Sequence, residues 1–394
     1  MAAPTRLAPP VISATFCIAQ RYHNQMLSPT IPPTGGPSAD DQASSTALHQ
    51  RIVETITAHG GWIPFSEFMN LALYAPGLGY YASGRPVFGS GGDFVTAPEL
   101  GGLFAETLSR WIGGVLPDDA RTITEFGAGN GTLAAQLLAA PCLSDVRYRI
   151  VELSGALSAR QREAVAAVPG ALDRTEWLDA LPDRLDGIVL GNEVLDAMPV
   201  HLLVGHNGSV LERGVTAIRG ELDWSDASPT AEALAARAAQ RIARGDWPDG
   251  YLSEVHPRQE AFVASLAERL HSGALVFIDY GFDEATYYHP QRNQGTLRCH
   301  HRHRAGDQPL VWPGLQDITA HVNFDALTEV AAEAGLEGGH VPMAQFLLDA
   351  GILEVLSQVS PDDAARYLPL SAEANRLLSP AEMGELFRVA VWGR

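Results

Sequence analysis

A glycine-rich loop at residues 125–132 constrains the fold of this chain more than any other segment. The run Thr122-Ile123-Thr124, rich in β-branched residues, leads into the loop, and Gly127-Ala128-Gly129-Asn130-Gly131 follows. A helix is predicted to begin near Thr132. Strand, glycine loop and helix in this order are typical of the first unit of a Rossmann-like fold.

Strands and helices continue to alternate after this unit, and each alternation predicts one more parallel strand. The last apolar run of the chain, 386–392, is predicted to be a strand at an antiparallel edge of the same sheet. The sequence therefore predicts an α/β fold. The other elements expected are a strand at 148–153, a helix at 156–168, a short strand ending near Trp177, and buried strands at 187–190 and 274–279.

The rest of the chain is predicted to surround this sheet. Residues 1–47 contain Pro and Ser/Thr clusters and no acidic residue before Asp40, which favours a disordered leader. Residues 48–120 are expected to form an N-terminal helical and Gly-rich lobe. Residues 121–394 are expected to form the Rossmann-like domain, with insertions at about 205–250 and 287–325.

Charge and cysteine content exclude several classes of function. The formal net charge of -19 disfavours contact with nucleic-acid phosphates, so no nucleic-acid partner is expected. The three cysteines form no CxxC pair, and the run 299–303 (Cys-His-His-Arg-His) lacks the paired spacing of a zinc site, so no metal is predicted. Without 18 consecutive apolar residues, no membrane span is expected.

The glycine loop is the predicted cofactor site, because glycines let backbone amides approach a ligand at the start of a helix. Glu152 ends the next predicted strand, where a carboxylate can accept hydrogen bonds from both hydroxyls of a ribose. That placement suits NAD or S-adenosylmethionine. The GxGxG spacing favours S-adenosylmethionine, since the NAD fingerprint is GxGxxG. An ordinary solvated acid at a strand end is the alternative for Glu152.

Acidic residues follow the next two predicted strands. Asn192, Glu193 and Asp196 come after the strand at 187–190, and Asp279 with Tyr280 ends the strand at 274–279. Ligands of open α/β sheets bind at this carboxyl edge, which favours a functional role. A helix cap at Asn192 and a simple turn at Asp279 are the alternatives.

Together these segments resemble the mitochondrial complex I assembly methyltransferase family (MidA-like), which includes bacterial members. The resemblance covers most of the chain from Leu48 onward. The loop departs from the family's usual Gly-Pro-Gly-Arg-Gly at Ala128 and Asn130. The matching segments are 74–81 (YAPGLGYY), 92–99 (GDFVTAPE), 125–133 (EFGAGNGTL), 192–199 (NEVLDAMP), 278–281 (IDYG) and 317–324 (DITAHVNF).

The resemblance implies a class I methyltransferase fold, S-adenosylmethionine as donor, and a protein substrate. For mitochondrial members it implies symmetric dimethylation of an arginine in a complex I subunit. The acids predicted to hold the acceptor are Glu193, Asp196 and Asp279, with Glu99 and Glu254 as outer candidates. The residues predicted to bind the cofactor are Thr96, Pro98, Glu99, Glu125, Gly127, Ala128, Gly129, Gly131, Glu152, Leu153 and Asn192.

Several further expectations accompany this interpretation. Tyr80, Tyr81 and Phe94 are candidates for a lid, with core packing as the alternative, and His321 is expected to orient a loop near the pocket. Two other functions stay open: methylation of a small molecule or another side chain, and a non-catalytic assembly factor. A homodimer is possible. A bacterial cytoplasmic location is expected, or the mitochondrial matrix if the leader is a transit peptide.

Overall fold

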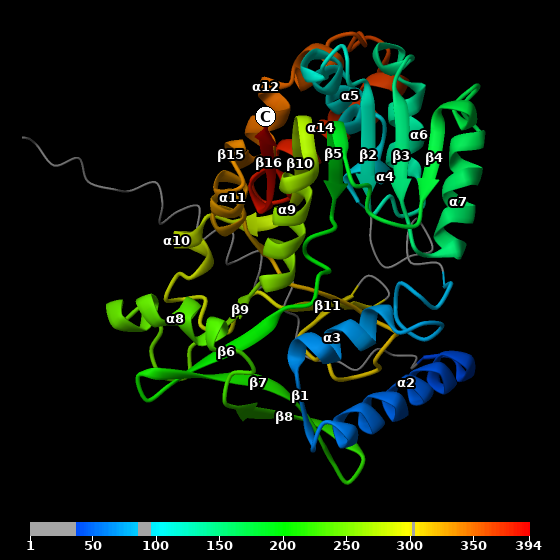
Figure 1. The fold of residues 1–394 in the computed structure, drawn as a ribbon. Coiled ribbons are helices and arrows are strands. Elements are labelled where there is room, and N and C mark those ends of the chain that lie inside the picture. Colours follow the sequence, from blue (N-terminus) through cyan, green and yellow to red (C-terminus); the bar gives the residue numbers. More distant parts are fainter. Residues whose placement is uncertain (1–36, 86–95, 302–303) are drawn as a thin grey trace, which may run out of the picture.

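The computed structural model describes residues 37–85, 96–301 and 304–394. These residues form two lobes, one above the other in Figure 1. The upper lobe is built on an eight-stranded sheet, and the lower lobe combines a five-stranded sheet with a three-stranded sheet. The predicted α/β class is confirmed.

The eight-stranded sheet is parallel over most of its width. Strands β4, β3, β2, β5 and β10 lie side by side and run in one direction, as the alternation predicted. The order across the sheet is β15 (Glu337–Pro342), β16 (Phe387–Gly393), β10 (Leu270–Phe282), β5 (Leu185–Asn192), β2 (Thr122–Phe126), β3 (Arg147–Val151) and β4 (Thr175–Leu178), and β14 (Val322–Asn323) pairs with the end of β10.

The final strand corrects one expectation. β16 is antiparallel to β10, as predicted, but it also pairs with β15 on its other side. It is therefore the second strand from the edge. The sequence run Glu337-Gly338-Gly339-His340, which begins the true edge strand, has two glycines and little apolar character, so it gave no strand signal.

Alternate side chains of the central strands enter two separate cores. On β5, Ile188 and Leu190 pack with α5, α6 and α12 to α14, whereas Val189 packs with α9 and α11 on the other face. This alternation follows from the two-residue period of a strand. The helices around the sheet are α4 (Ala97–Leu100), α5 (Leu103–Val115), α6 (Thr132–Ala139), α7 (Gly155–Ala166), α9 (Pro257–Arg269), α11 (Phe324–Glu333), α12 (Met343–Asp349), α13 (Ile352–Leu356), α14 (Ala364–Leu378) and α15 (Met383–Leu386).

The lower lobe is assembled from segments that lie far apart in the sequence. The N-terminal strand β1 pairs with β7, and the buried residues of α2 and α3 share one core with Val200, Val215 and Ile318. Its elements are α2 (Ala39–Ala58), β1 (Trp62–Pro64), α3 (Phe65–Tyr74), β6 (His201–His206), β7 (Ser209–Ile218), β8 (Glu221–Ala227), α8 (Glu232–Arg244), β9 (Leu252–Val255), α10 (Glu284–Tyr287), β11 (Arg298–His301), β12 (Arg304–Gly306) and β13 (Asp317–Thr319).

This assembly corrects the predicted domain boundaries. The two predicted insertions contribute most of the lower lobe, together with residues before Tyr81, rather than decorating the main sheet. Residues 97–115, which were assigned to the N-terminal lobe, form α4 and α5 and pack in the core of the upper lobe.

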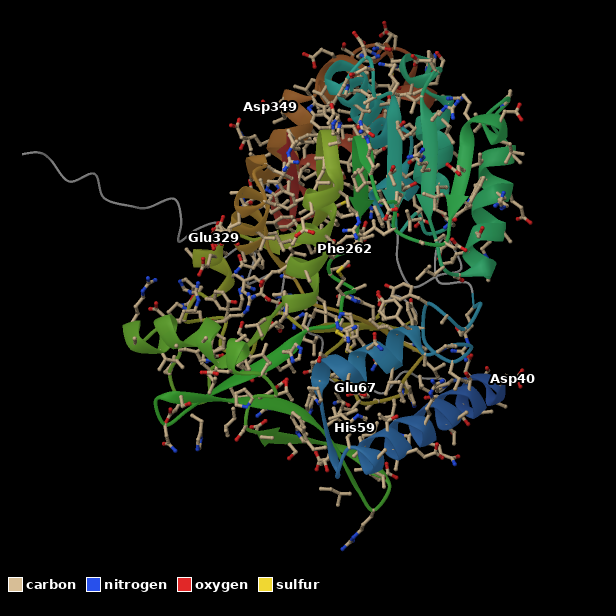
Figure 2. All side chains as sticks on the ribbon, in the orientation of Figure 1. Asp40, His59, Glu67, Phe262, Glu329 and Asp349 are labelled. Carbon is tan, nitrogen blue, oxygen red and sulfur yellow. The ribbon has the colours of Figure 1, made fainter. Side chains whose placement is uncertain are left out.

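The predicted leader is also too long. Helix α2 begins at Ala39, nine residues before the predicted boundary, because Ser38 caps it by accepting a hydrogen bond from Asp41 N at 3.2 Å. Asp40 and Asp41 then place negative charge in the first turn, where the helix dipole favours it. Figure 2 shows Asp40 at the outer end of α2. Only residues 1–36 of the predicted leader lie outside the described part.

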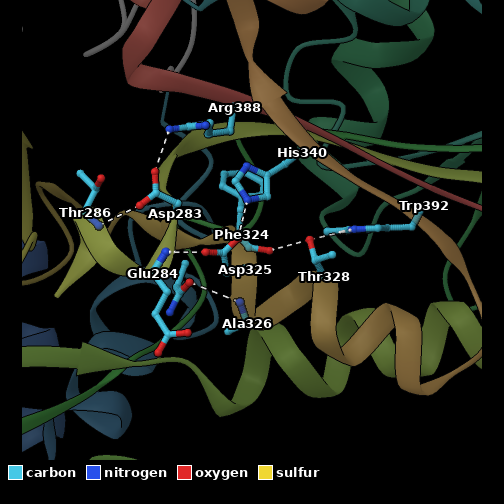
Figure 3. A network of polar contacts seen from close by, with 11 residues as sticks. Asp283, Glu284, Thr286, Phe324, Asp325, Ala326, Thr328, His340, Arg388 and Trp392 are labelled. Carbon is cyan, nitrogen blue, oxygen red and sulfur yellow. Dashed lines mark hydrogen bonds and ion pairs between the residues drawn. The ribbon is translucent and has the colours of Figure 1, made fainter. Parts of the chain in front are cut away.

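A polar network fastens the far end of β10 to its neighbours (Figure 3). Asp283 accepts from Arg388 Nη2 of β16 at 3.3 Å, and Asp325 Oδ1 lies 2.8 Å from His340 Nε2 of β15. Asp325 also accepts from Glu284 N at 2.8 Å. These contacts fix the exit of β10, from which the cavity residue Tyr280 projects. No helix within the described ranges is both long and apolar enough to cross a membrane.

Candidate active site

A cavity of about 1280 Å³ lies between the carboxyl edge of the main sheet and the lower lobe. Its floor comes from the segments that follow β2, β3 and β5, and from Phe262 of α9, which Figure 2 labels beside this region. Its other wall comes from the Gly-rich segment after α3 and from β11 and β13. The cavity is large enough for a nucleoside cofactor and part of a second molecule.

The glycine loop adopts the conformation that its sequence predicts. Gly127, Gly129 and Gly131 have φ angles of 66°, 54° and 85°, in the left-handed region that glycine adopts at least cost. A Cβ on Gly127 would lie 2.1 Å from Val194 Cγ2, and a Cβ on Gly131 would lie 2.8 Å from Gln161 Cα. Neighbouring atoms therefore leave no room for a side chain at Gly127 or Gly131. Gly131 does not line the cavity.

Asn130 fastens the glycine loop to Glu99 of α4. Its Oδ1 accepts from Thr132 N at 3.0 Å, and its Nδ2 donates to Glu99 Oε1 at 3.0 Å. Glu99 also accepts from Thr96 N at 3.3 Å within the capping box of α4. Glu99 thus holds the loop and does not line the cavity, whereas Thr96 and Pro98 do.

Glu152 lies in the cavity wall at the end of β3, as predicted. Its Oε1 accepts from Ser154 N at 2.7 Å and its Oε2 from Gln161 Nε2 at 2.9 Å. Gln161 of α7 also donates to Gly129 O at 3.1 Å, so one buried amide joins the carboxylate to the glycine loop. Leu153, 82% exposed, borders the same part of the cavity.

Glu125 and Asn192 complete the predicted cofactor region. Glu125 accepts from Tyr148 OH at 2.9 Å, and burial raises its pKa to about 7. Asn192 ends β5, and its Oδ1 is buried with no hydrogen-bond partner within the described structure. A buried acceptor without a donor is costly, so a bound molecule that donates a hydrogen bond here would be stabilised.

Glu193, which lines the cavity, has a strained backbone. Its φ of 52° is unusual for a residue with a side chain and is typical of functional sites. Its N–H donates to Ile278 O at 2.8 Å, and its Oε1 accepts from Asn192 Nδ2 at 3.2 Å. Burial, followed by the charge of Asp279, raises the pKa of Glu193 to about 8. This group accepts a proton more readily than an exposed glutamate.

Asp279 has a different role from the predicted one. Its Oδ2 accepts from the N–H groups of Val194, Leu195 and Asp196 at 3.0, 2.8 and 3.3 Å, and its Oδ1 accepts from Tyr280 N at 2.9 Å. The side chain is 1% exposed and does not line the cavity. Asp279 therefore holds the loop 193–197 and cannot contact an acceptor.

Asp196 and Asp317 bring two more carboxyl groups to the cavity. Asp196 is 6% exposed, and burial and then the charges of Asp279 and Asp317 raise its pKa. Asp317 begins β13 and accepts from Tyr81 OH at 2.9 Å. Tyr81 stacks on Tyr74 with ring centroids 5.7 Å apart, and both rings line the cavity.

Sequence reasoning missed some of these residues and misplaced others. Asp317, Tyr74 and Gln161 were given no role, although Asp317 and Tyr74 lie in segments that carried the family resemblance. Glu254, an outer candidate, is fully buried away from the cavity and accepts from Thr296 N at 2.8 Å and Tyr287 OH at 3.0 Å.

The remaining aromatic and histidine predictions divide between the cavity and the core. Tyr80 is 5% exposed and belongs to the lower core, whereas Tyr81 lines the cavity. Phe94 lies outside the described residues. His321 lines the cavity and stacks on Tyr280 with centroids 6.0 Å apart. In the part of the chain that the structure describes, no group of three or more His, Cys, Asp or Glu residues could hold a metal ion.

Comparison with known proteins agrees with this geometry. The model of the family described as "Putative S-adenosyl-L-methionine-dependent methyltransferase" matches residues 104–340, more than half of the chain. A crystal structure of a Burkholderia thailandensis protein bound to S-adenosyl-homocysteine is 47% identical, with a TM-score of 0.85, and the match covers 91% of this chain and 95% of that one.

Two curated relatives carry a more specific name. The mitochondrial protein arginine methyltransferase NDUFAF7 of Xenopus tropicalis is 28% identical, over 96% of this chain and 91% of its own length. The mitochondrial NDUFAF7 homologue of Caenorhabditis elegans, also named a protein arginine methyltransferase, is 28% identical over 87% of this chain and 84% of its own length. The sheet order, the glycine loop with Glu152 and the family match lead to one conclusion: the chain belongs to the family of S-adenosylmethionine-dependent methyltransferases.

Proposed function

We propose that this protein methylates an arginine side chain of another protein, and that the acceptor is a subunit of respiratory complex I or a similar protein. The observation that carries the proposal is the presence of two largely buried carboxyl groups, Glu193 and Asp196, in the cavity that contains the glycine loop. A guanidinium carries a positive charge and five N–H donors, so it suits such a pair. The names of the mitochondrial relatives support the same acceptor class.

The residues at the end of β2 and β3 fit the methyl donor. The glycine loop presents backbone at the start of α6, and Glu152 has carboxylate oxygens for ribose hydroxyls. Asn192 Oδ1 is a buried acceptor to which no described residue donates a hydrogen bond. Thr96, Pro98, Ala128 and Leu153 border the same space. When bound, S-adenosylmethionine supplies a methyl group that its sulfonium has already activated.

The protein then has to orient the acceptor nitrogen and remove one proton. Methyl transfer forms an N–C bond and breaks the C–S bond, whose electron pair stays on sulfur, while the nitrogen loses a proton. Glu193 and Asp196 accept hydrogen bonds from the guanidinium and direct one nitrogen toward the donor. Glu193 in its ionised form, which a neighbouring guanidinium cation favours, takes the released proton. Asp196, only 6% exposed, is largely shielded from competing water.

Identification of the methylated residue tests this proposal. Purified protein is incubated with S-adenosylmethionine carrying a tritiated methyl group and with an extract of the source organism, and the labelled protein is hydrolysed to amino acids. The label is expected in methylarginine. The Glu193→Gln variant should lose the signal, and Glu329→Gln, on the exposed surface of α11 (Figure 2), should keep it.

Other outcomes would identify the alternatives. Label in a small molecule or in another side chain would contradict arginine as the acceptor. Absence of label, with intact donor binding, would support a non-catalytic assembly factor. The homodimer and the bacterial cytoplasmic location stay predictions, which light scattering and cell fractionation can test.

A further inference from the structure

One face of the three-stranded sheet is polar and turned toward the cavity. In the antiparallel register of β11 and β13, Arg298 pairs with Thr319 and His300 pairs with Asp317. Paired residues project from the same face of a sheet, and residues two apart on one strand do too. These four side chains, which we call the roof face, all line the cavity.

The opposite face of the same strands is apolar. Cys299 and Ile318, the residues between those of the roof face, are 1% and 0% exposed and pack in the core of the lower lobe. The sheet is therefore fixed on one side by its own core. It presents its polar side chains to the cavity, opposite the carboxyl edge of the main sheet.

Within the roof face, Asp317 is the one acidic residue. It is 3% exposed, and its charge is among the causes that raise the pKa of both Glu193 and Asp196. Ala320, one residue beyond β13, donates to Asp196 O at 3.0 Å, which ties the two lobes together at this point.

One tyrosine holds Asp317, and a second links that tyrosine to the acid loop of the upper lobe. The hydroxyl of Tyr81 donates to Asp317 Oδ1 at 2.9 Å, and Ile318 N donates to the same oxygen at 2.9 Å. Tyr81 stacks on Tyr74, whose hydroxyl donates to Ala197 O at 2.9 Å in the loop that carries Glu193 and Asp196. The carboxylate of the lower lobe is thereby held against the acid loop of the upper lobe.

We propose that Asp317, held by Tyr81, is a specificity-determining residue that selects a cationic guanidinium as the acceptor. This inference rests on the proposed function and adds that the lower lobe takes part in recognition. Three carboxyl groups that line one cavity from two lobes repel one another, and a bound cation relieves that repulsion. The tyrosine rings beside them offer a flat face on which a planar guanidinium stacks. A neutral group of the same shape neither relieves the repulsion nor gains the cation–π part of the stacking.

A pair of small peptides separates charge from shape. The probes are N-acetyl-Gly-Arg-Gly-amide and its citrulline counterpart, which replaces the guanidinium with a neutral urea group of similar shape. Each is titrated by calorimetry into protein saturated with S-adenosylhomocysteine. The wild-type protein is expected to bind the arginine peptide at least about tenfold more tightly, in line with the strength of hydrogen bonds to charged groups.

Three variants locate the source of that preference. Asp317→Asn should weaken binding of the arginine peptide by roughly tenfold and leave the affinity for the citrulline peptide unchanged. Tyr81→Phe, which keeps the ring but removes the hydroxyl, should also weaken binding of the arginine peptide, by less than Asp317→Asn does. In the Asp317→Asn background it should reduce that affinity little further. Asp349→Asn removes the same charge from the exposed end of α12 (Figure 2), outside the cavity, and should have no effect.

A second readout distinguishes recognition from loss of structure. The charged and polar groups around Glu193 are Asp279, Glu99 and Asp317, which raise its pKa after burial, and Asn192, which lowers it. Asp317→Asn should therefore move the acidic limb of the kcat/KM profile to lower pH. S-adenosylhomocysteine affinity should stay at the wild-type value. If Asp317→Asn does not fold, Tyr81→Phe alone still tests the inference.

The results that overturn the inference differ from those that overturn the proposed function. The inference fails if the wild-type protein binds both peptides equally or not at all, or if Asp317→Asn and Tyr81→Phe keep the wild-type preference. If methylarginine is found but the peptide experiments give one of these results, only the role of Asp317 is wrong. If no methylarginine is found in the labelling experiment, the proposed function itself is wrong.

Discussion

Substitution of Gly127 by alanine tests the structural basis of the glycine loop. Two costs follow from the geometry. An alanine at φ 66° costs about 1–2 kcal/mol because its Cβ crowds the backbone in the left-handed region. The same Cβ would lie 2.1 Å from Val194 Cγ2, and such overpacking costs about 1–3 kcal/mol more. The free energy of unfolding should therefore fall by about 2–5 kcal/mol.

A second substitution separates the two costs. Val194→Ala removes the obstructing methyl group, and the added Cβ then meets only the Cβ of residue 194, at an ordinary 3.5 Å. In that background Gly127→Ala should cost only the backbone strain of about 1–2 kcal/mol. Urea denaturation of the four proteins measures the free energies of unfolding, and calorimetry measures S-adenosylmethionine binding.

Donor binding should follow the same pattern. Because the overpacked alanine pushes the glycine loop away from the loop at 193–197, Gly127→Ala should weaken S-adenosylmethionine binding by about tenfold or more, and the double variant should recover part of it. An equal penalty in both backgrounds would show that Val194 is not the obstacle. Gly127→Val, with a larger β-branched side chain, should abolish donor binding even where the protein folds.

Three further substitutions test single carboxyl groups. Glu152→Ala should weaken donor binding by about 1–3 kcal/mol in calorimetry, and a loss below roughly twofold would exclude it from the donor site. Burial raises the pKa of Glu125 to about 7, so its ionisation destabilises the fold as pH rises from 4.5 through 7. Glu125→Gln should therefore gain up to about 3 kcal/mol relative to wild type at pH 8 and little at pH 4, in denaturation experiments at both pH values. Asp279→Asn should lower stability by about 1–3 kcal/mol, because an amide in place of either oxygen faces a backbone N–H, and an unchanged melting temperature would contradict that role.

The parts of the fold that the sequence predicted are those with local causes. The strand at 122–126, the glycine turns and the start of α6 at Thr132 depend on neighbouring residues, and all three lie where they were expected. The carboxyl edge of the parallel strands likewise brought Glu152, Asn192 and Glu193 to one cavity. Because parallel strands end at the same edge of the sheet, the residue that follows each strand is enough to predict that these side chains lie together.

Other features depend on contacts between distant segments, and the sequence does not encode them locally. Glu193 and Asp279 both follow buried strands, yet one faces the cavity and the other accepts four backbone N–H groups. Only the path of the loop 193–197 distinguishes them. Gln161 lies within a helix with no motif around it, and its role depends on Gly129 and Glu152 being adjacent.

The assembly of the lower lobe also depends on contacts between distant segments, and the sequence did not predict it. Its core joins α2 and α3 to residues near Val200, Val215 and Ile318, and no periodicity within one segment predicts such an assembly. The helix at residue 39 was missed for a different reason. Its capping signal, Ser38 followed by Asp40 and Asp41, was present in the sequence but was assigned to the leader.

The division of the cavity into a donor region and an acceptor region is the central claim of this account. Glu193→Gln tests it most directly, because the amide keeps the size of the side chain and removes its charge and its capacity to take a proton. We predict that calorimetry will find S-adenosylmethionine affinity near the wild-type value, while methyl transfer to the arginine acceptor falls by at least about a hundredfold. Wild-type transfer by this variant, or loss of donor binding in step with transfer, would contradict the division.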